Sequence, residues 1–280
     1  MIKKTLLITT GLGYILARKA IRDVFKRYDE RDTPIVLDIP HTNITFKSEN
    51  HQLYGNLFGN NEKGLVVFSH GLGWGSDEYF PLIKALASNG YQVLAYDATG
   101  TFRSQGDSTV GINQSVIDLK HALEYVIRNK NLDYSRLFLV GHSWGGYAVA
   151  ALLNEKKYPV DGIVSLAGSN STCQMLWHNS EDKFQKALVG FGVMYHVLSF
   201  GKFAFYTAVK GLNKSQVPAL IVHGTNDTIV DLKTTSIVSC RNKIHNPKVE
   251  YYLMDEDHNS ILENEELIQR MCAFFDSIRT

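Results

Sequence analysis

The sequence predicts an α/β fold: a mostly parallel central sheet covered by helices on both faces, with a helical lid insertion. Short apolar runs, typical of strands buried on both faces, alternate along the chain with longer segments of helical periodicity. This alternation is the pattern of βαβ units, which build parallel sheets. The expected strands are residues 64–69, 91–96, 137–140, 162–168, 218–224 and 249–254, and the expected helices are residues 79–88, 112–129 and 264–277.

The composition is that of an ordinary globular protein. The 280 residues, 44% hydrophobic and 20% charged, suffice for one large α/β domain or two small ones. A net charge of +1 gives no strong field that would favour nucleic acid as a partner. The three cysteines, Cys173, Cys240 and Cys272, lie far apart, which argues against a disulfide framework and a cysteine-ligated zinc site. A reducing compartment, the cytoplasm, is the simplest expectation.

Two regions depart from the strand–helix alternation. Residues 31–60 hold short β-prone pieces at 35–37, 44–46 and 53–58, which predict antiparallel hairpins at a sheet edge. Residues 170–214 contain no expected strand and are rich in aromatic side chains. This insertion is expected to form a lid over the carboxyl ends of the strands, where open α/β folds bind ligands. Most of its aromatic side chains are expected to pack in the lid, and a few to touch a ligand.

A G-x-S-x-G motif directly follows the expected strand 137–140. In this strand–turn–helix context, Ser143 is expected at the tip of a strained nucleophile elbow, with its hydroxyl exposed. Glycine is needed at Gly141 and Gly145 because side chains there would collide with the neighbouring strand and helix. His142 is expected to plug the turn. Glycine-rich strand–helix turns also bind phosphates, so the motif by itself leaves both functions open.

Two later residues stand where a serine nucleophile needs its partners. A serine hydroxyl requires a base, and the base requires a third group that fixes its tautomer. Asp227 and His258 each directly follow an expected strand, as Ser143 does, so all three are expected to meet at one edge of the sheet. Asp231 is the competitor for the acid, and it is expected to start the following helix.

The third requirement is a pair of backbone N–H groups for the oxyanion. One is expected from Trp144, the residue after the serine, and the other from Leu72. The flanking Gly71 and Gly73 would let the Leu72 backbone approach the substrate closely, in a loop that begins with His70.

With these motifs, residues 40–280 resemble the α/β-hydrolase superfamily, in particular its lidded serine aminopeptidase-like and monoglyceride-lipase-like members. Asp97, Gly100 and Ser104 also match a supporting loop of that superfamily, in which Phe102 stands where glycine is common. Asp257 is a second departure, because many relatives have glycine before the histidine. Its charge beside the imidazole would favour the protonated form.

The resemblance and the motifs together predict hydrolysis of a small or lipid-like carboxylic ester through an acyl-enzyme. Ser143 would attack, His258 would transfer the proton, and Asp227 would orient the imidazole. No metal, cofactor or nucleic acid is expected, and the aromatic lid suggests a modest apolar acyl or alcohol group. Amide or thioester hydrolysis and acyl transfer would use the same residues and remain open. So does a non-catalytic sensor of small molecules on the same fold. The sequence does not predict the oligomeric state.

Residues 1–30 form an apolar and basic segment ahead of the expected domain, residues 31–280. Basic residues flank an apolar run at residues 5–17, which is shorter than the roughly twenty residues that span a bilayer. Residues 1–28 would then be a helix on the membrane surface, a cleaved signal peptide, or a helix packed on the domain. If they are only an anchor, their deletion should leave activity on a soluble ester unchanged.

Overall fold

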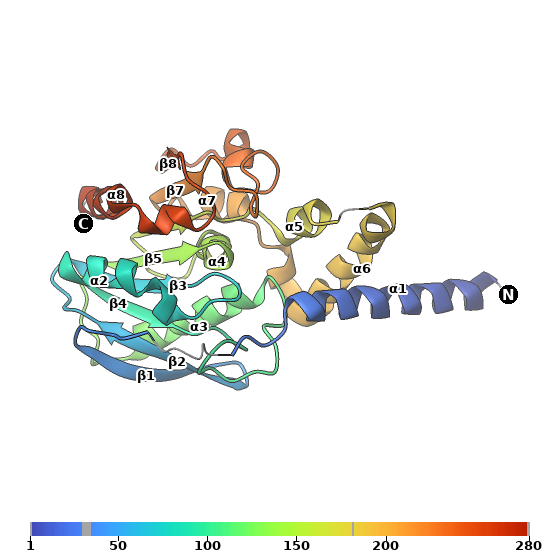
Figure 1. The fold of residues 1–280 in the computed structure, drawn as a ribbon, viewed down its shortest axis with the longest axis horizontal. Coiled ribbons are helices and arrows are strands. Elements are labelled where there is room, and N and C mark those ends of the chain that lie inside the picture. Colours follow the sequence, from blue (N-terminus) through green and yellow to red (C-terminus); the bar gives the residue numbers. More distant parts are fainter. Residues whose placement is uncertain (1, 30–34, 181, 279–280) are drawn as a thin grey trace.

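The computed structural model describes residues 2–29, 35–180 and 182–278, and it is built around one eight-stranded sheet (Figure 1). The strand order is β1-β2-β4-β3-β5-β6-β7-β8, in which β1 pairs antiparallel with β2, β2 pairs antiparallel with β4, and the other pairs are parallel. The strands are β1 (His41–Ser48), β2 (His51–Phe58), β3 (Gly64–Ser69), β4 (Tyr91–Tyr96), β5 (Leu137–His142), β6 (Gly162–Leu166), β7 (Ala219–Gly224) and β8 (Val249–Met254).

Helices cover both faces of this sheet. Along β3, Leu65 and Val67 point into one hydrophobic core while Val66 and Phe68 point into the other, because successive strand residues face opposite sides. One core is shared with α3 (Gln114–Arg128), α4 (Trp144–Leu152) and α7 (Ala208–Ser215), and the other with α2 (Phe80–Ser88) and α8 (Glu265–Ser277). The predicted fold class is confirmed.

The edge of the sheet differs from the prediction at one place. The expected hairpin forms as β1 and β2, but the strand expected at residues 35–37 is wrong, because residues 35–38 are irregular. Val36 is 79% exposed, so its β-branched side chain has no sheet surface on which to pack. Residues 30–34, which also belonged to the region of expected hairpins, lie outside the described residues.

The insertion between β6 and β7 is helical. It comprises α5 (Thr172–His178), α6 (Lys183–Phe200), the short 3₁₀ helix η2 (Gly201–Phe205) and α7. Among the described residues, one stretch, Lys183–Ser215, is long and apolar enough to cross a membrane by length and composition alone. Of the residues in its most apolar part, 22% are buried. In the structure, however, this stretch is broken into α6, η2 and α7, and α7 packs on α4.

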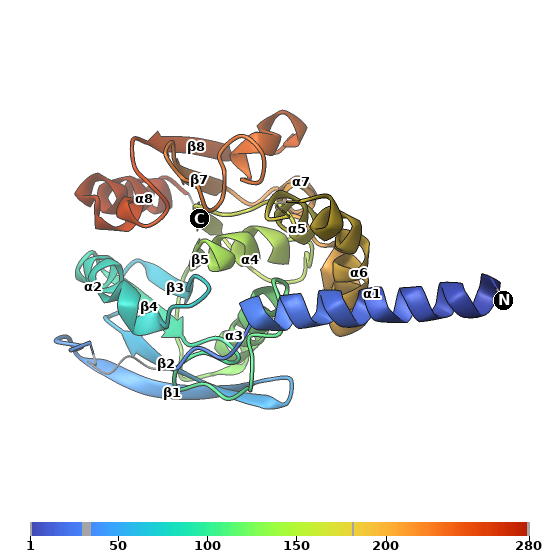
Figure 2. The same cartoon turned by 45° about the vertical axis from the view of Figure 1, so that its right-hand side comes forward.

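The N-terminal helix α1 (Ile2–Val24) lies against α6 and projects beyond it at its N-terminal end (Figure 2). The chain leaving α1 is clamped to the loop after β4. Tyr28 donates its amide to the Gly100 carbonyl at 3.0 Å and accepts the Phe102 amide at 2.7 Å. Arg27 donates to three carbonyls of the same loop, at 2.7 to 3.0 Å. Of the three interpretations of this segment, packing on the domain is the one for which the structure records contacts.

Candidate active site

Ser143 lies in a strained turn between β5 and α4. Its φ of +54° is a left-handed conformation that side chains rarely adopt. A Cβ at Gly145 would overlap the Ser69 carbonyl oxygen at the end of β3, and a Cβ at Gly141 would overlap the Gly145 carbonyl oxygen. The two glycines therefore allow the close strand–turn–helix approach that holds the hydroxyl beyond the end of the sheet.

The structure brings Ser143, His258 and Asp227 together in a hydrogen-bonded chain. The His258 Nε2 atom is 2.8 Å from the Ser143 hydroxyl oxygen, and His258 Nδ1 is 2.7 Å from the Asp227 Oδ2 atom. Since a carboxylate only accepts, Nδ1 carries the proton and Nε2 is free to accept the serine proton. Asp231, the competitor for the acid, instead accepts hydrogen bonds from the Lys233 amide and the Thr234 hydroxyl.

The Asp227 carboxylate is held in its charged form. Burial by itself would raise its pKa, but hydrogen bonds from His223 and His258 outweigh burial, so the pKa lies well below its ordinary value. The Ile229 and Val230 amides also donate to its second oxygen, Oδ1, both at 2.9 Å. His223 Nε2 lies 3.2 Å from Asp227 Oδ2. The sequence placed His223 only at a strand end, and no motif signalled this contact with the acid.

His142 does more than plug the turn. Its Nε2 donates to the His258 carbonyl at 2.9 Å, and its Nδ1 accepts from the Tyr79 hydroxyl at 2.7 Å. Burial, followed by the nearby His258 charge, lowers the pKa of His142 to about 3, so the ring is neutral and the direction of these bonds is fixed. Tyr79 in turn accepts the Gly71 amide at 2.9 Å.

This network joins three loops that reach the site from different strands: the loop after β3, the elbow after β5 and the loop after β8. The sequence analysis did not single out Tyr79, because a tyrosine in a short 3₁₀ helix (Ser76–Tyr79) carries no motif. Only the folded chain shows that it lies 2.7 Å from a histidine 63 residues away.

Leu72 and Trp144 both line the cavity on which Ser143 and His258 lie, and their role as oxyanion-hole donors stays a prediction. Trp144 is the first residue of α4, and the first N–H groups of a helix have no acceptor within it. Leu72 lies in a turn that follows β3, and the next residue, Gly73, has a φ of +84°. The buried His70 fixes this loop: its Nδ1 donates to the Gly71 carbonyl, and its Nε2 accepts the Ala98 amide. Burial lowers the pKa of His70, which keeps that ring neutral.

The two departures from the superfamily pattern have structural explanations. Phe102 has a φ of +44°, a conformation that glycine adopts without strain, and its backbone is held there by Arg27 and Tyr28. Asp97, in the same loop, accepts from the Ser76 amide and hydroxyl and from the Arg103 guanidinium. Asp257 turns its carboxylate toward the Asn259 and Ser260 amides, which lower its pKa. Its effect on His258 stays a prediction.

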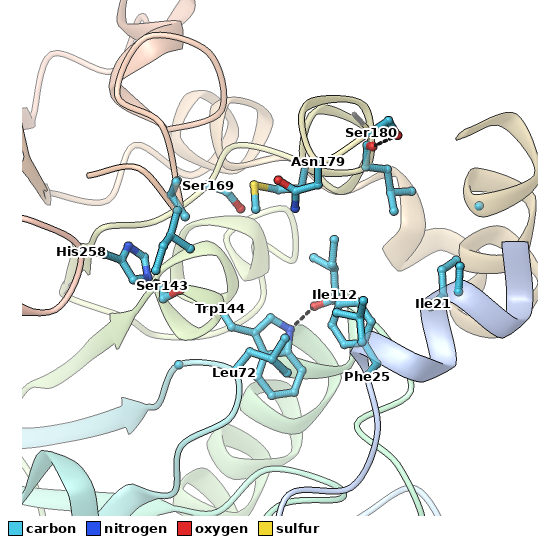
Figure 3. Close-up of a pocket in the computed structure, with 18 of the residues that line it drawn as sticks. Ile21, Phe25, Leu72, Ile112, Ser143, Trp144, Ser169, Asn179, Ser180 and His258 are labelled. Atoms are coloured by element: carbon cyan, nitrogen blue, oxygen red, sulfur yellow. Dashed lines mark hydrogen bonds between the residues drawn. The ribbon is translucent and has the colours of Figure 1, made fainter. Parts of the chain in front are cut away.

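A cavity of about 710 Å³ opens beside Ser143 and His258. In Figure 3, these two residues lie at one end of the cavity, and Ile21 of α1 and Phe25, just after α1, lie toward the other. The insertion contributes Met175, Leu176, Asn179, Ser180, Gln185, Leu188, Val189 and Gly192. No described aromatic residue of the insertion lines this cavity, whose lid side is aliphatic and polar, so contact of lid aromatics with a ligand stays a prediction.

Comparison with known proteins agrees with this fold. The model of the serine aminopeptidase S33 family matches residues 60–189. An esterase of Pyrococcus furiosus superposes with a TM-score of 0.69 at 19% identity, over 91% of this chain and all of that structure. A monoacylglycerol lipase of Paleococcus ferrophilus superposes with a TM-score of 0.62 at 20% identity, over 81% of this chain and 99% of that structure. By fold, the chain is an α/β-hydrolase.

Two curated relatives set the limits of this likeness. A proline iminopeptidase of Clostridioides difficile is 28% identical over 134 residues, which are 46% of this chain and 44% of the relative. The uncharacterised protein YfhR of Salmonella typhi is 23% identical over 258 residues, 88% of this chain and 83% of the relative. The family match and the fold confirm the predicted resemblance and support hydrolysis in general as the chemistry.

Proposed function

We propose that this hydrolase cleaves a carboxylic ester with an apolar acyl or alcohol group through an acyl-enzyme on Ser143. The observation that carries the proposal is the hydrogen-bonded chain of Ser143, His258 and Asp227 at one end of an apolar cavity. Esterase and lipase names among the structures of the same fold are consistent with it.

The cavity wall favours an uncharged substrate. Among the described residues that line it, none is Asp, Glu, Lys or Arg. An aminopeptidase must hold the ammonium group of its substrate, and burying that charge without a partner is costly. A charged acyl carrier would face the same penalty inside the cavity. A neutral ester with an apolar group avoids it, which places peptide hydrolysis second despite the names of the family and of one relative.

In the proposed mechanism, His258 Nε2 removes the Ser143 proton as the hydroxyl oxygen attacks the ester carbonyl carbon. The Leu72 and Trp144 amides stabilise the negative oxygen of the tetrahedral intermediate. His258 then returns the proton to the leaving alcohol as the carbon–oxygen bond breaks. Water, deprotonated by the same imidazole, then attacks the acyl carbon; the bond from that carbon to Ser143 Oγ breaks, His258 returns the proton to Oγ, and the acid is released. Asp227 stabilises the imidazolium that forms in both steps.

A fluorophosphonate probe tests the nucleophile, and a substrate panel tests the reaction. We expect the probe to label the wild-type protein and to leave Ser143→Ala unlabelled. We also expect p-nitrophenyl esters to be cleaved faster than aminoacyl nitroanilides or acyl thioesters. An unlabelled serine in folded protein would favour the non-catalytic sensor, and faster cleavage of a nitroanilide would favour the peptidase.

The outer face of α1 supports the predicted membrane-surface association. Leu12, Ile15 and Leu16, spaced along one face of the helix, are 56%, 61% and 40% exposed, with the exposed Arg18 and Lys19 beside them. We propose that this face rests on an anionic bilayer, where apolar side chains enter the interface and cations meet headgroups. Sedimentation with phosphatidylcholine vesicles, with and without phosphatidylglycerol, tests it. Replacing the three apolar residues by serine should abolish binding to the anionic vesicles; unchanged binding would contradict the proposal.

A further inference from the structure

We propose that the end of α1 and the residue after it, residues 17–25, form the far wall of a binding site for a linear acyl chain and thereby set the chain length of the substrate. Ala17, Ile21 and Phe25 are buried and line the cavity, while Ala20 and Val24 line it near the solvent. The inference deepens the proposed ester hydrolysis and rests on it.

The shape of the cavity places a chain between Ser143 and α1. Figure 3 shows Ile112 and Trp144 in the middle of the cavity, with Ser143 on one side and Ile21 on the other. The wall near α1 is apolar: Leu188 and Val189 of α6 face it together with Ile21. The volume of about 710 Å³ lies within the range of about 300 to 1,000 Å³ found for small-molecule sites.

The acyl part of the substrate suits this site better than the alcohol part. After the first step, the alcohol must leave while the acyl group stays bound to Ser143 until water attacks. Contacts along an apolar wall are therefore most useful to the part that is retained. The wall contains no described Asp, Glu, Lys or Arg, as a hydrocarbon chain requires.

The α1 wall is fixed to the domain at two places. Gly13 lies against the ring of Phe191 on α6, and Gly192 lies beside Leu176 and Ile21, so α1 and α6 approach closely. Beyond the helix, Phe25 accepts the Thr109 amide at 3.0 Å. Removal of residues 1–28 would open the far end of the cavity, so on this inference the deletion should lower activity on a soluble ester instead of leaving it unchanged.

The test narrows the site at a position that can accept a larger side chain without overpacking. Ala20→Trp should lower kcat/KM for p-nitrophenyl octanoate about tenfold or more relative to p-nitrophenyl acetate, since differences of this size follow from lost room for methylene groups. Ile21→Ala should raise the preference for the dodecanoate over the octanoate. Asp23→Trp, exposed on the same helix and away from the cavity, should leave the octanoate-to-acetate ratio unchanged.

A second readout separates this inference from the proposed reaction. In a Ser143→Ala background, 11-dansylaminoundecanoic acid should bind with enhanced fluorescence, and Ala20→Trp should weaken that binding about tenfold. If the wild type cleaves no ester, the proposed function fails, and the fluorescent acid still reports on the site. If esters are cleaved but Ala20→Trp shifts neither the chain-length ratio nor the binding, α1 is not the acyl wall. A loss confined to acetate esters of long alcohols would also overturn it.

Discussion

The two ends of the cavity are built in different ways. At the Ser143 end, each functional side chain directly follows a parallel strand, and buried hydrogen bonds connect the loops. At the α1 end, the wall consists of apolar side chains from helices far apart in sequence, α1 and α6, held by helix packing and a clamp on one loop. Directional hydrogen bonds thus hold the catalytic side chains in place. Chain preference, by contrast, depends on packing that tolerates substitution.

The largest expected effect is at the Ser143 end of the cavity. Asp227→Asn should lower kcat about 10⁴-fold with the fold intact, because the imidazole loses the acceptor that fixes its tautomer. Asp231→Asn is the matched control, since its carboxylate accepts from the Lys233 amide and the Thr234 hydroxyl of a nearby turn, and it should be close to wild type. Steady-state kinetics on p-nitrophenyl acetate measures both. A large loss in Asp231→Asn with a small one in Asp227→Asn would reassign the acid.

Tyr79→Phe tests whether the hydrogen bonds of Tyr79 and His142 position the catalytic His258. Loss of the hydroxyl leaves the Gly71 amide without its acceptor and His142 Nδ1 without its donor. We expect kcat to fall about 10- to 100-fold with little change in KM, consistent with about 1–3 kcal/mol for a buried polar group left unpaired. Tyr147→Phe, which also removes a buried and bonded hydroxyl, should lower stability but not kcat. Equal kinetics for the two variants would reduce Tyr79 to a structural role.

The neutral His142 makes the same end sensitive to acid. Its pKa of about 3 in the folded protein lies below the value of about 6.5 in the unfolded chain, so the unfolded state takes up the proton first. The contribution of His142 to the free energy of unfolding is therefore fully present above about pH 6.5. It falls by about 1.4 kcal/mol per pH unit as the pH is lowered from about 6.5 toward about 3. When the pH is lowered from 7 to 5, the free energy of unfolding measured with urea should fall by about 2 kcal/mol less in His142→Gln than in wild type. Identical losses would mean that this ring does not titrate on unfolding.

The smallest expected effect is at the α1 end. Arg27→Ala removes three hydrogen bonds to the carbonyls of Phe102, Ser104 and Gly106, and should lower the free energy of unfolding by about 1–2 kcal/mol. Because this clamp positions α1, the ratio of octanoate to acetate activity should fall as well, while acetate kinetics stay near wild type. Arg22→Ala, at an exposed position on α1, is the control. A loss of acetate activity in Arg27→Ala would show that the clamp also serves the catalytic end.

The sequence by itself determined the fold class and the positions of Ser143, Asp227 and His258 along it. Buried strands read as apolar runs, and the residues that follow them must meet at one edge of a parallel sheet. Gly141 and Gly145 were predictable for the same local reason, since the turn leaves no room for a Cβ.

Only the tertiary structure decided which residues surround that edge. Tyr79 bonds to His142, which is far away in the sequence, and no motif encodes the contact of His223 with Asp227. Helix α1 lines the cavity because it packs against α6. Helix packing depends on shape complementarity between surfaces that are distant in sequence, and local periodicity does not contain that information. For that reason an N-terminal segment that reads as an anchor or a signal also forms a wall of the cavity.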